Sequence, residues 1–146
     1  MKRINEYKKL FGVENEIELG TLKKSYRNLV KEWHPDKFQD GDALKEEAEI
    51  NSRRIIDGYH FLVSMAPETL EANLPAYTET ITNSGIADYQ HKGQLLEITF
   101  MDGSTYEYFG VTKQVYIKMI NSGKLNRFAK RAIYPNYKYR MSKREL

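Results

Sequence analysis

Pro35 sets the point where one helix must end, and this constrains how the first half of the chain folds. Residues 22–33 place apolar side chains on one stripe at helical spacing, namely Leu22, Tyr26, Leu29, Val30 and Trp33. Because Pro35 has no backbone N–H and disfavours a helical residue before it, this helix must stop at His34. A polar loop follows, and Asp42 can cap a second amphipathic segment that runs to about residue 64.

Two antiparallel helices joined by a short loop bury their apolar stripes against each other, so we expect a helical hairpin. The second helix carries its stripe on Leu44, Ala48, Ile55, Tyr59 and Leu62. Ile50 and Phe61 fall on the opposite side of this helix, where they are expected to meet another element. A short helix over residues 4–11 is expected to pack across the hairpin.

The chain of 146 residues has no cysteine, which excludes disulfides and thiolate metal sites. Its three histidines are too scattered to suggest a metal site, and we expect neither a metal nor a cofactor. The N-terminus lacks the apolar run of a signal peptide, and no segment approaches the length of a membrane span. We therefore expect a soluble, cytoplasmic protein that contacts no membrane.

Charge is distributed unevenly along the chain. Residues 1–80 carry 12 Lys and Arg against 15 Asp and Glu, whereas residues 81–146 carry 11 against 5. Net charges of −3 and +6 are typical of two units with different partners. We expect a mixed fold: an all-α domain over residues 1–66, a proline-punctuated linker over 67–82 with one helical turn, and a small α+β domain over 83–142.

The C-terminal part shows the alternating pattern of β-strands. Three strands of an antiparallel sheet are expected, over residues 85–90, 95–100 and 104–109. Asp102-Gly103 is a strong signal for the hairpin turn between the last two strands, in which Tyr106 and Tyr108 share a face. Thr112 can cap a helix, and the remaining residues, 124–146, are basic and rich in tyrosine.

The helical part contains a pattern of three stretches: Glu6-Tyr7…Leu10-Phe11-Gly12-Val13, then Leu22-Lys23-Lys24-Ser25-Tyr26-Arg27-Asn28-Leu29…Trp33-His34-Pro35-Asp36-Lys37, then Ile55-Ile56-Asp57-Gly58-Tyr59…Leu62. This pattern resembles a J-domain, the module of DnaJ-type co-chaperones. Ser52 departs from it, because the family usually has an apolar residue there, and Glu18-Leu19-Gly20 replaces the usual start of the second helix. Neither a glycine/phenylalanine-rich segment nor a cysteine-rich zinc module follows, so the chain resembles a minimal, divergent J-protein.

The tripeptide His34-Pro35-Asp36 alone fits an ordinary helix stop with a capping aspartate. Between two amphipathic helices it instead indicates a docking surface, because Pro35 rigidifies the turn that presents His34 and Asp36. The resemblance implies that the partner is a DnaK-type ATPase chaperone, and that a basic helix face docks on it in a salt-sensitive manner. The partner-binding residues expected on this basis are His34, Pro35, Asp36, Lys23, Lys24, Arg27, Lys31 and Lys37.

The C-terminal part contains a more diffuse pattern, carried by Ser84, Ile86, Tyr89, Leu96, Phe100, Asp102-Gly103, Tyr106, Tyr108, Gly110-Val111, Tyr116, Ser122-Gly123, Asn126, Ile133 and Tyr139. This pattern resembles a KTSC domain, a small module named for its likeness to a C-terminal region of lysyl-tRNA synthetase. The name implies a link to RNA and does not establish a function.

Two interpretations of the basic tail remain open. Its cations could follow nucleic-acid phosphates while Tyr134, Tyr137 and Tyr139 stack on bases; the candidate residues are Lys124, Arg127, Lys130, Arg131, Tyr137 and Lys138. Alternatively, the tyrosines pack on the sheet and the lysines keep the domain soluble. We favour the second interpretation, because tyrosine is amphipathic and often lies at the edge of a core.

A catalytic role is not indicated by the sequence. Three serines, Ser84, Ser104 and Ser122, have no evident base partner, and His60 and His91 are expected to be structural or exposed. The leading hypothesis is a non-enzymatic co-chaperone of protein folding that stimulates ATP hydrolysis by a DnaK-type heat-shock chaperone acting on a client protein. The alternative is an RNA-binding adaptor that recruits the chaperone.

Overall fold

The computed structural model describes residues 2–144, and the chain divides into two compact units, Met1–Thr69 and Leu70–Leu146. The expected mixed fold, with a helical N-terminal part and an α+β C-terminal part, is confirmed. Within residues 2–144 no helix is both long and apolar enough to cross a membrane.

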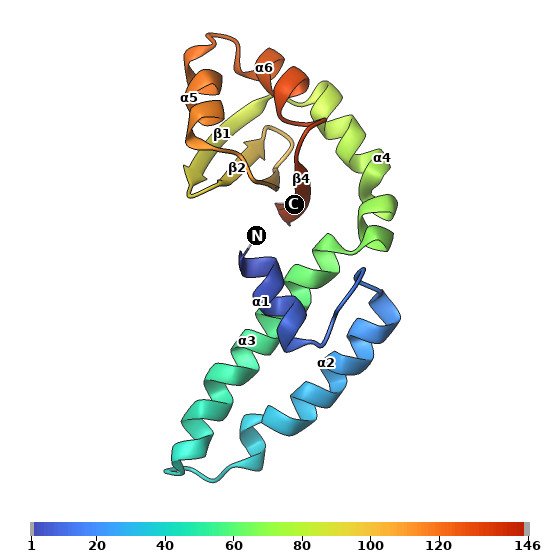
Figure 1. Ribbon diagram of the computed structural model, residues 1–146, viewed down its shortest axis with the longest axis vertical. Coiled ribbons are helices and arrows are strands. Elements are labelled where there is room, and N and C mark those ends of the chain that lie inside the picture. The colour runs from blue at the N-terminus through green and yellow to red at the C-terminus, as the bar shows by residue number, and fades with distance from the viewer. Residues whose placement is uncertain (1, 145–146) are drawn as a thin grey trace. The chain divides into compact units, whose positions relative to one another are not determined.

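Three helices build the first unit: α1 (Lys2–Leu10), α2 (Leu19–Trp33) and α3 (Ala43–Met65). Figure 1 shows α2 and α3 side by side and running in opposite directions, joined by the short 3₁₀ helix η1 (Pro35–Lys37) and a polar loop. The predicted hairpin is therefore present. Helix α2 begins three residues earlier than expected, because the N–H of Leu19 donates to Oε1 of Glu68 at 3.4 Å, a partner distant in the sequence.

The hairpin core follows the predicted stripes, except at its tip. Leu22, Ile55 and Leu62 are buried, and the rings of Tyr26 and Tyr59 are stacked with their centroids 4.1 Å apart. Leu44, which was expected on the buried stripe, is half exposed. It lies in the first turn of α3 beside the loop, where little of α2 remains to cover it.

Helix α1 packs across α3, as predicted. Phe61 was expected to meet another element, and its ring packs on that of Tyr7 with centroids 5.4 Å apart. The guanidinium of Arg3 lies 4.2 Å from the centroid of the Phe61 ring. Gly58 makes this approach feasible, because an added Cβ there would lie 2.7 Å from Cδ1 of Tyr7. Ile50, by contrast, meets no neighbouring element and is exposed.

The predicted linker over residues 67–82 is wrong, because these residues form the helix α4 (Pro67–Asn83). Pro67 occupies the first helical position, where its missing N–H costs nothing. Pro75 lies inside the helix, and tertiary contacts on the same helix outweigh its low propensity. Tyr77 is buried and stacks on Tyr139, and the hydroxyl of Thr80 donates to Oδ2 of Asp102 at 2.7 Å.

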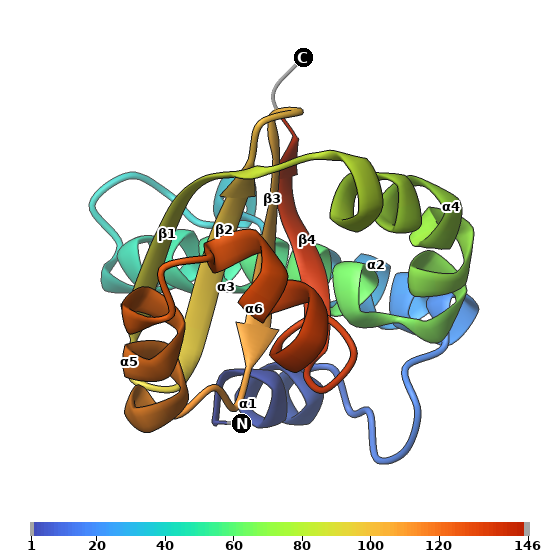
Figure 2. The same ribbon diagram turned by 90° about the horizontal axis from the view of Figure 1, so that it is seen from above.

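The second unit contains a four-stranded antiparallel sheet in the order β1-β2-β3-β4. Its strands are β1 (Ile86–Lys92), β2 (Leu95–Phe100), β3 (Ser104–Phe109) and β4 (Lys138–Arg144). The helices α5 (Lys113–Asn121) and α6 (Leu125–Ala132) are inserted between β3 and β4, and Figure 2 shows them over the sheet. The three predicted strands and the capped helix α5 are confirmed.

One face of the sheet carries the core of this unit. Tyr106 and Tyr108 share this face, as predicted, and pair with Ile98 and Leu96 of β2. The same core includes one residue from each covering helix, Tyr77 of α4, Met119 of α5 and Ala129 of α6. Besides α4, the sequence did not reveal α6 and β4, which come from the basic tail, where frequent charges mask the apolar pattern.

Candidate functional site

The loop after α2 holds His34, Pro35 and Asp36 in a fixed turn. His34 ends α2 and caps η1, because its Nδ1 accepts a hydrogen bond from the N–H of Asp36 at 3.2 Å. The N–H of Lys37 donates to the carbonyl of His34 at 3.0 Å, and Pro35 supplies the first residue of η1. With Nδ1 accepting, the neutral ring carries its proton on Nε2, so the other ring nitrogen can donate to a partner.

The cap in this turn is the histidine and not the aspartate. The Asp36 side chain is 90% exposed, and its Oδ2 lies 3.6 Å from Nδ1 of His34. An ordinary helix stop with a capping aspartate would use this carboxylate locally. Because the ring of His34 provides the cap instead, the Asp36 carboxylate is available to accept hydrogen bonds from a partner.

The loop is also tied to the start of α3. The ammonium of Lys45 forms a hydrogen-bonded ion pair with the Asp40 carboxylate. The hydrogen bond from Lys45 holds the pKa of the Asp40 carboxyl below its usual value. Asp42 caps α3, as predicted, by accepting from the N–H of Leu44 at 2.9 Å. These contacts restrain the end of the loop next to α3, so less entropy would be lost on binding of a partner.

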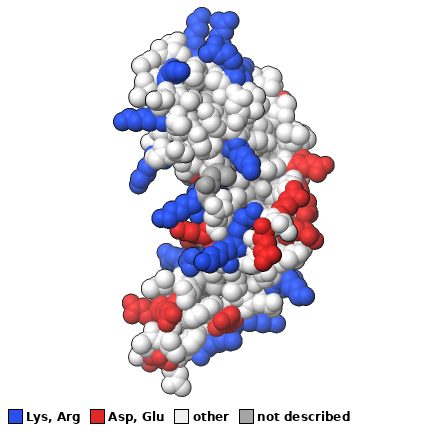
Figure 3. Space-filling model, in the orientation of Figure 1, with Lys and Arg blue, Asp and Glu red and all other residues white. Residues whose placement is uncertain are grey.

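Helix α2 presents a basic face next to this turn. Lys23, Lys24, Arg27 and Lys31 are exposed at three- and four-residue spacing, and Lys37 extends the set into η1. Within residues 2–144 none of these five forms an ion pair with another side chain. Figure 3 shows Lys and Arg side chains along the edge formed by α2 and acidic side chains over the first half of α3. The structure thus brings the predicted docking residues together.

A groove beside the tripeptide was not predicted. A cavity of about 520 Å³ is lined by Pro35 together with Glu49, Ser52, Arg53, Ile56 and Asp57 of α3. The sequence feature that could have indicated this groove is Ser52, a small polar residue at a position where a larger apolar side chain would fill the space. The small side chain of Ser52 leaves this space open, so α3 contributes a wall of mixed charge next to the turn at Pro35.

The candidate nucleic-acid residues of the C-terminal unit divide into two groups. Lys124, Arg127, Lys130, Arg131 and Lys138 are exposed, as a binding face would need. The tyrosines are not: Tyr134 is buried, Tyr139 stacks on Tyr77 with centroids 3.9 Å apart, and Tyr137 packs partly buried against the core. The structural interpretation of the tyrosines therefore holds for Tyr134 and Tyr139, whose ring faces are taken up by packing.

Small polar side chains stabilise the turn between β2 and β3. Oδ1 of Asp102 accepts from the N–H of Ser104 at 2.9 Å and from its hydroxyl at 2.6 Å, and the hydroxyl of Ser84 accepts from the N–H of Asp102. Gly103 has a φ of 89°, which favours glycine.

The family model of the KTSC domain matches residues 82–137. The resemblance read from the sequence is thereby confirmed for this part of the chain.

Other polar residues in the part that matches the KTSC model have structural partners. His91 Nε2 lies 2.7 Å from the carbonyl of Val111, and its ring is stacked on Tyr116 with centroids 4.6 Å apart. The hydroxyl of Ser122 donates to the carbonyl of Met119 at the end of α5. Among the described residues, no group of three or more His, Asp or Glu side chains could hold a metal ion.

The N-terminal part is similar to DnaJ proteins. It is 39% identical over 57 residues to DnaJ homolog subfamily B member 6-B of Xenopus laevis, 37% over 59 residues to chaperone protein DnaJ of Hydrogenobacter thermophilus, and 38% over 56 residues to DnaJ homolog subfamily B member 8 of Mus musculus. These matches cover 39%, 40% and 38% of this chain. They cover only 22%, 15% and 23% of the relatives' own lengths.

Proposed function

We propose that this chain is a co-chaperone that docks on a DnaK-type ATPase chaperone and stimulates its ATP hydrolysis. The observation that carries the proposal is the turn at His34, Pro35 and Asp36, in which Nδ1 of His34 accepts from the Asp36 N–H while Nε2 and the exposed Asp36 carboxylate are left for a partner. The similarity of about 57 residues to DnaJ chaperones supports the same partner. The chain itself breaks no bond in this scheme.

The basic face of α2 supplies the electrostatic part of docking. Exposed cations mainly raise the association rate with an acidic surface, and their effect declines as salt screens the charges. The exposed acidic residues Glu46, Glu47 and Glu49 at the start of α3 would oppose such a surface, so they orient the approach through α2. The KTSC domain, in this proposal, selects the target or the location of the chaperone.

A single-turnover ATPase assay with a DnaK-type chaperone tests the proposal. We expect the full chain to accelerate hydrolysis, and His34→Gln to abolish the acceleration while leaving the helical circular dichroism unchanged. His60→Gln is the matched control, because His60 is an exposed histidine on α3 away from the turn. Acceleration that persists in His34→Gln, or that is lost equally in His60→Gln, would contradict the proposal.

A further inference from the structure

A cavity on the KTSC domain carries an inference that is independent of chaperone docking. It has a volume of about 270 Å³ and lies between the last turn of α4 and the end of α6. Its walls are Ile81 and Thr82 of α4, Lys130 of α6, and Tyr134 and Pro135, which follow α6. Three of these side chains are largely apolar, so the cavity combines an apolar wall with few polar groups, as ligand sites do.

Tyr134 places an unpartnered hydroxyl in this cavity. The residue is only 7% exposed, and its ring packs against Phe100 and Tyr108 with centroids 5.8 and 5.7 Å away. Within residues 2–144 its hydroxyl bonds no protein group, although a buried tyrosine usually finds such a partner. Every fully buried polar side-chain atom of the described residues is satisfied, so the Tyr134 hydroxyl keeps access to the cavity.

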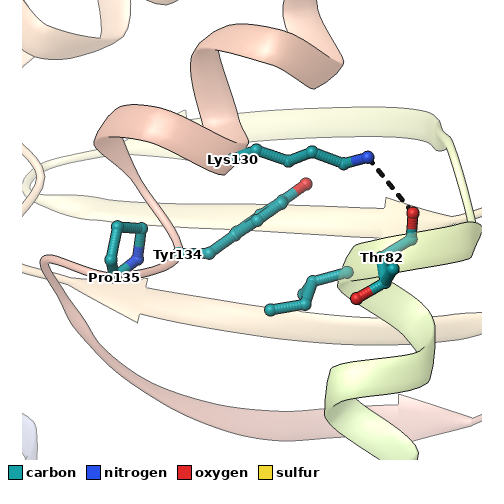
Figure 4. A pocket seen from close by; sticks show the side chains of 5 residues that line it. Thr82, Lys130, Tyr134 and Pro135 are labelled. Atoms are coloured by element: carbon teal, nitrogen blue, oxygen red, sulfur yellow. Dashed lines mark hydrogen bonds between the residues drawn. The ribbon is translucent and has the colours of Figure 1, made fainter.

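Lys130 adds a cation at the same place. Its ammonium donates to the carbonyl of Thr82 at 3.1 Å, as a lysine that caps a helix C-terminus does. An ammonium has three N–H donors, so two remain for a ligand. Figure 4 shows the ring of Tyr134 beside the Lys130 side chain, with its hydroxyl directed toward the side where Lys130 meets Thr82. The hydroxyl and the ammonium thus converge on one edge of the apolar cavity.

We propose that this cavity binds a monocarboxylate that carries a small apolar or aromatic group. One carboxylate oxygen accepts from Lys130 and the other from the Tyr134 hydroxyl, while the apolar group lies against Ile81 and Pro135. A single cation balances a single negative charge. The dianion of a phosphate monoester is disfavoured, because the negative end of the α4 dipole lies at the Thr82 carbonyl.

Two sources share this chemistry: a free organic acid and the C-terminal residue of a polypeptide. Amide NMR titrations of the full chain distinguish them with three probes, N-acetylphenylalanine, a short peptide ending in phenylalanine, and the same peptide with a C-terminal amide. We expect saturable shifts at residues 81–82 and 129–134 with a carboxylate, and at least tenfold weaker binding of the amide. Tighter binding of the peptide than of the free acid assigns a polypeptide source, and the reverse order assigns a free acid.

Variants separate the proposed contacts from packing. Tyr134→Phe keeps the ring and removes only the hydroxyl, and Lys130→Gln removes the cation; each is expected to weaken carboxylate binding about tenfold. Arg131→Gln is the matched control, because Arg131 is an exposed cation on the same helix that does not line the cavity. The proposal is overturned if the amide binds as well as the carboxylate, if no probe shifts these residues, or if Tyr134→Phe binds like the parent.

Discussion

At the scale of single residues, the two ring nitrogens of His34 have different tasks. Nδ1 holds the turn by accepting from the N–H of Asp36, and Nε2 is left to donate outward. Asparagine can place its side-chain oxygen near the position of Nδ1 and lacks a group near Nε2. Glutamine can reach the Nε2 position but loses the short local acceptor that fixes the turn, so its donor is no longer held in place. The two substitutions therefore separate the cap from the outward donor.

We predict that His34→Asn keeps the turn and fails to stimulate the chaperone. Hydrogen exchange at the Asp36 amide measures the cap, and the ATPase assay measures docking. Asparagine should preserve exchange protection at Asp36, whereas His34→Gln should lose it, because an N-cap contact is worth about 1 kcal/mol. Stimulation by His34→Asn equal to that of the parent would show that the ring serves only as a cap.

Gly58 is the second residue with a decisive local role. An added Cβ would lie 2.7 Å from Cδ1 of Tyr7 and 3.1 Å from Cε2 of Phe11, so these rings, or α1 itself, must shift. We predict that Gly58→Ala destabilises the first unit by about 1–3 kcal/mol, as overpacking does. The fluorescence of Trp33, the single tryptophan of the chain, reports this unit during urea unfolding.

Gly20→Ala is the control for Gly58. Gly20 is also helical, but nothing lies within 4 Å of an added Cβ. Alanine there should be neutral or stabilising by up to about 1 kcal/mol, because it lowers the entropy of the unfolded chain. Equal effects of the two substitutions would show that the close approach of α1 does not depend on Gly58.

At the scale of elements, the sequence predicts those whose periodicity is strong and whose ends are marked locally. The hairpin of α2 and α3 follows from apolar stripes, Pro35 and Asp42, and the β2–β3 hairpin follows from Asp102-Gly103. Helix α4 could not be predicted, because Pro75 argues against a helix and the contacts that outweigh it lie on distant strands. Strand β4 could not be predicted either, because its sequence is rich in charged residues and the strand is formed by backbone pairing with β3, which is distant in the sequence.

The candidate site shows the same limit. The turn and the basic face were predictable, because both are local features of one helix and its loop. The groove at Ser52 and the cavity at Tyr134 were not, because each depends on which side chains fail to fill a space between elements. Spacing in the sequence carries no information on such unfilled volume.

Helix α4 is held to the sheet by a buried pair of hydroxyls. The hydroxyls of Tyr77 and Tyr108 lie 3.0 Å apart and either can donate. We predict that Tyr77→Phe lowers the free energy of unfolding by about 1–3 kcal/mol, because it leaves the Tyr108 hydroxyl buried without a partner. Urea unfolding followed by the near-UV circular dichroism of the tyrosines measures the change.

The double substitution of Tyr77 and Tyr108 by phenylalanine gives the control. With both hydroxyls removed, no polar group is left unsatisfied, so the double variant should be more stable than Tyr77→Phe alone. Strictly additive losses in the two single variants would show that the hydroxyls do not act as a pair.

At the scale of the whole molecule, the two units differ in what they bury. The first unit has an aliphatic and aromatic hairpin core and an exposed basic helix face, whereas the second buries the side chains of several tyrosines. Burial raises the pKa of Tyr77, Tyr108 and Tyr134 well above the usual value of tyrosine. The folded second unit therefore keeps these phenols neutral where an unfolded chain would ionise them.

The consequence is a loss of stability at high pH. Below the unfolded pKa, about 10, the three phenols are neutral in both states and folding is unaffected. Above it the unfolded chain loses protons that the folded unit retains, so each tyrosine lowers the free energy of unfolding by about 1.4 kcal/mol per pH unit. We predict cooperative unfolding of the second unit above this pH, seen as a joint rise in tyrosinate absorbance and loss of near-UV circular dichroism.

Tyr134→Phe provides a graded version of this experiment. It removes one of the titrating groups and leaves the ring packed on Phe100 and Tyr108, so stability should fall less steeply with pH. The slope should decrease by the contribution of one tyrosine, about 1.4 kcal/mol per pH unit. Gradual ionisation of all tyrosines around pH 10 with the near-UV signal intact would contradict the burial argument. The same variant tests the cavity, so a loss of carboxylate binding at neutral pH, where its stability is unchanged, isolates the role of the hydroxyl.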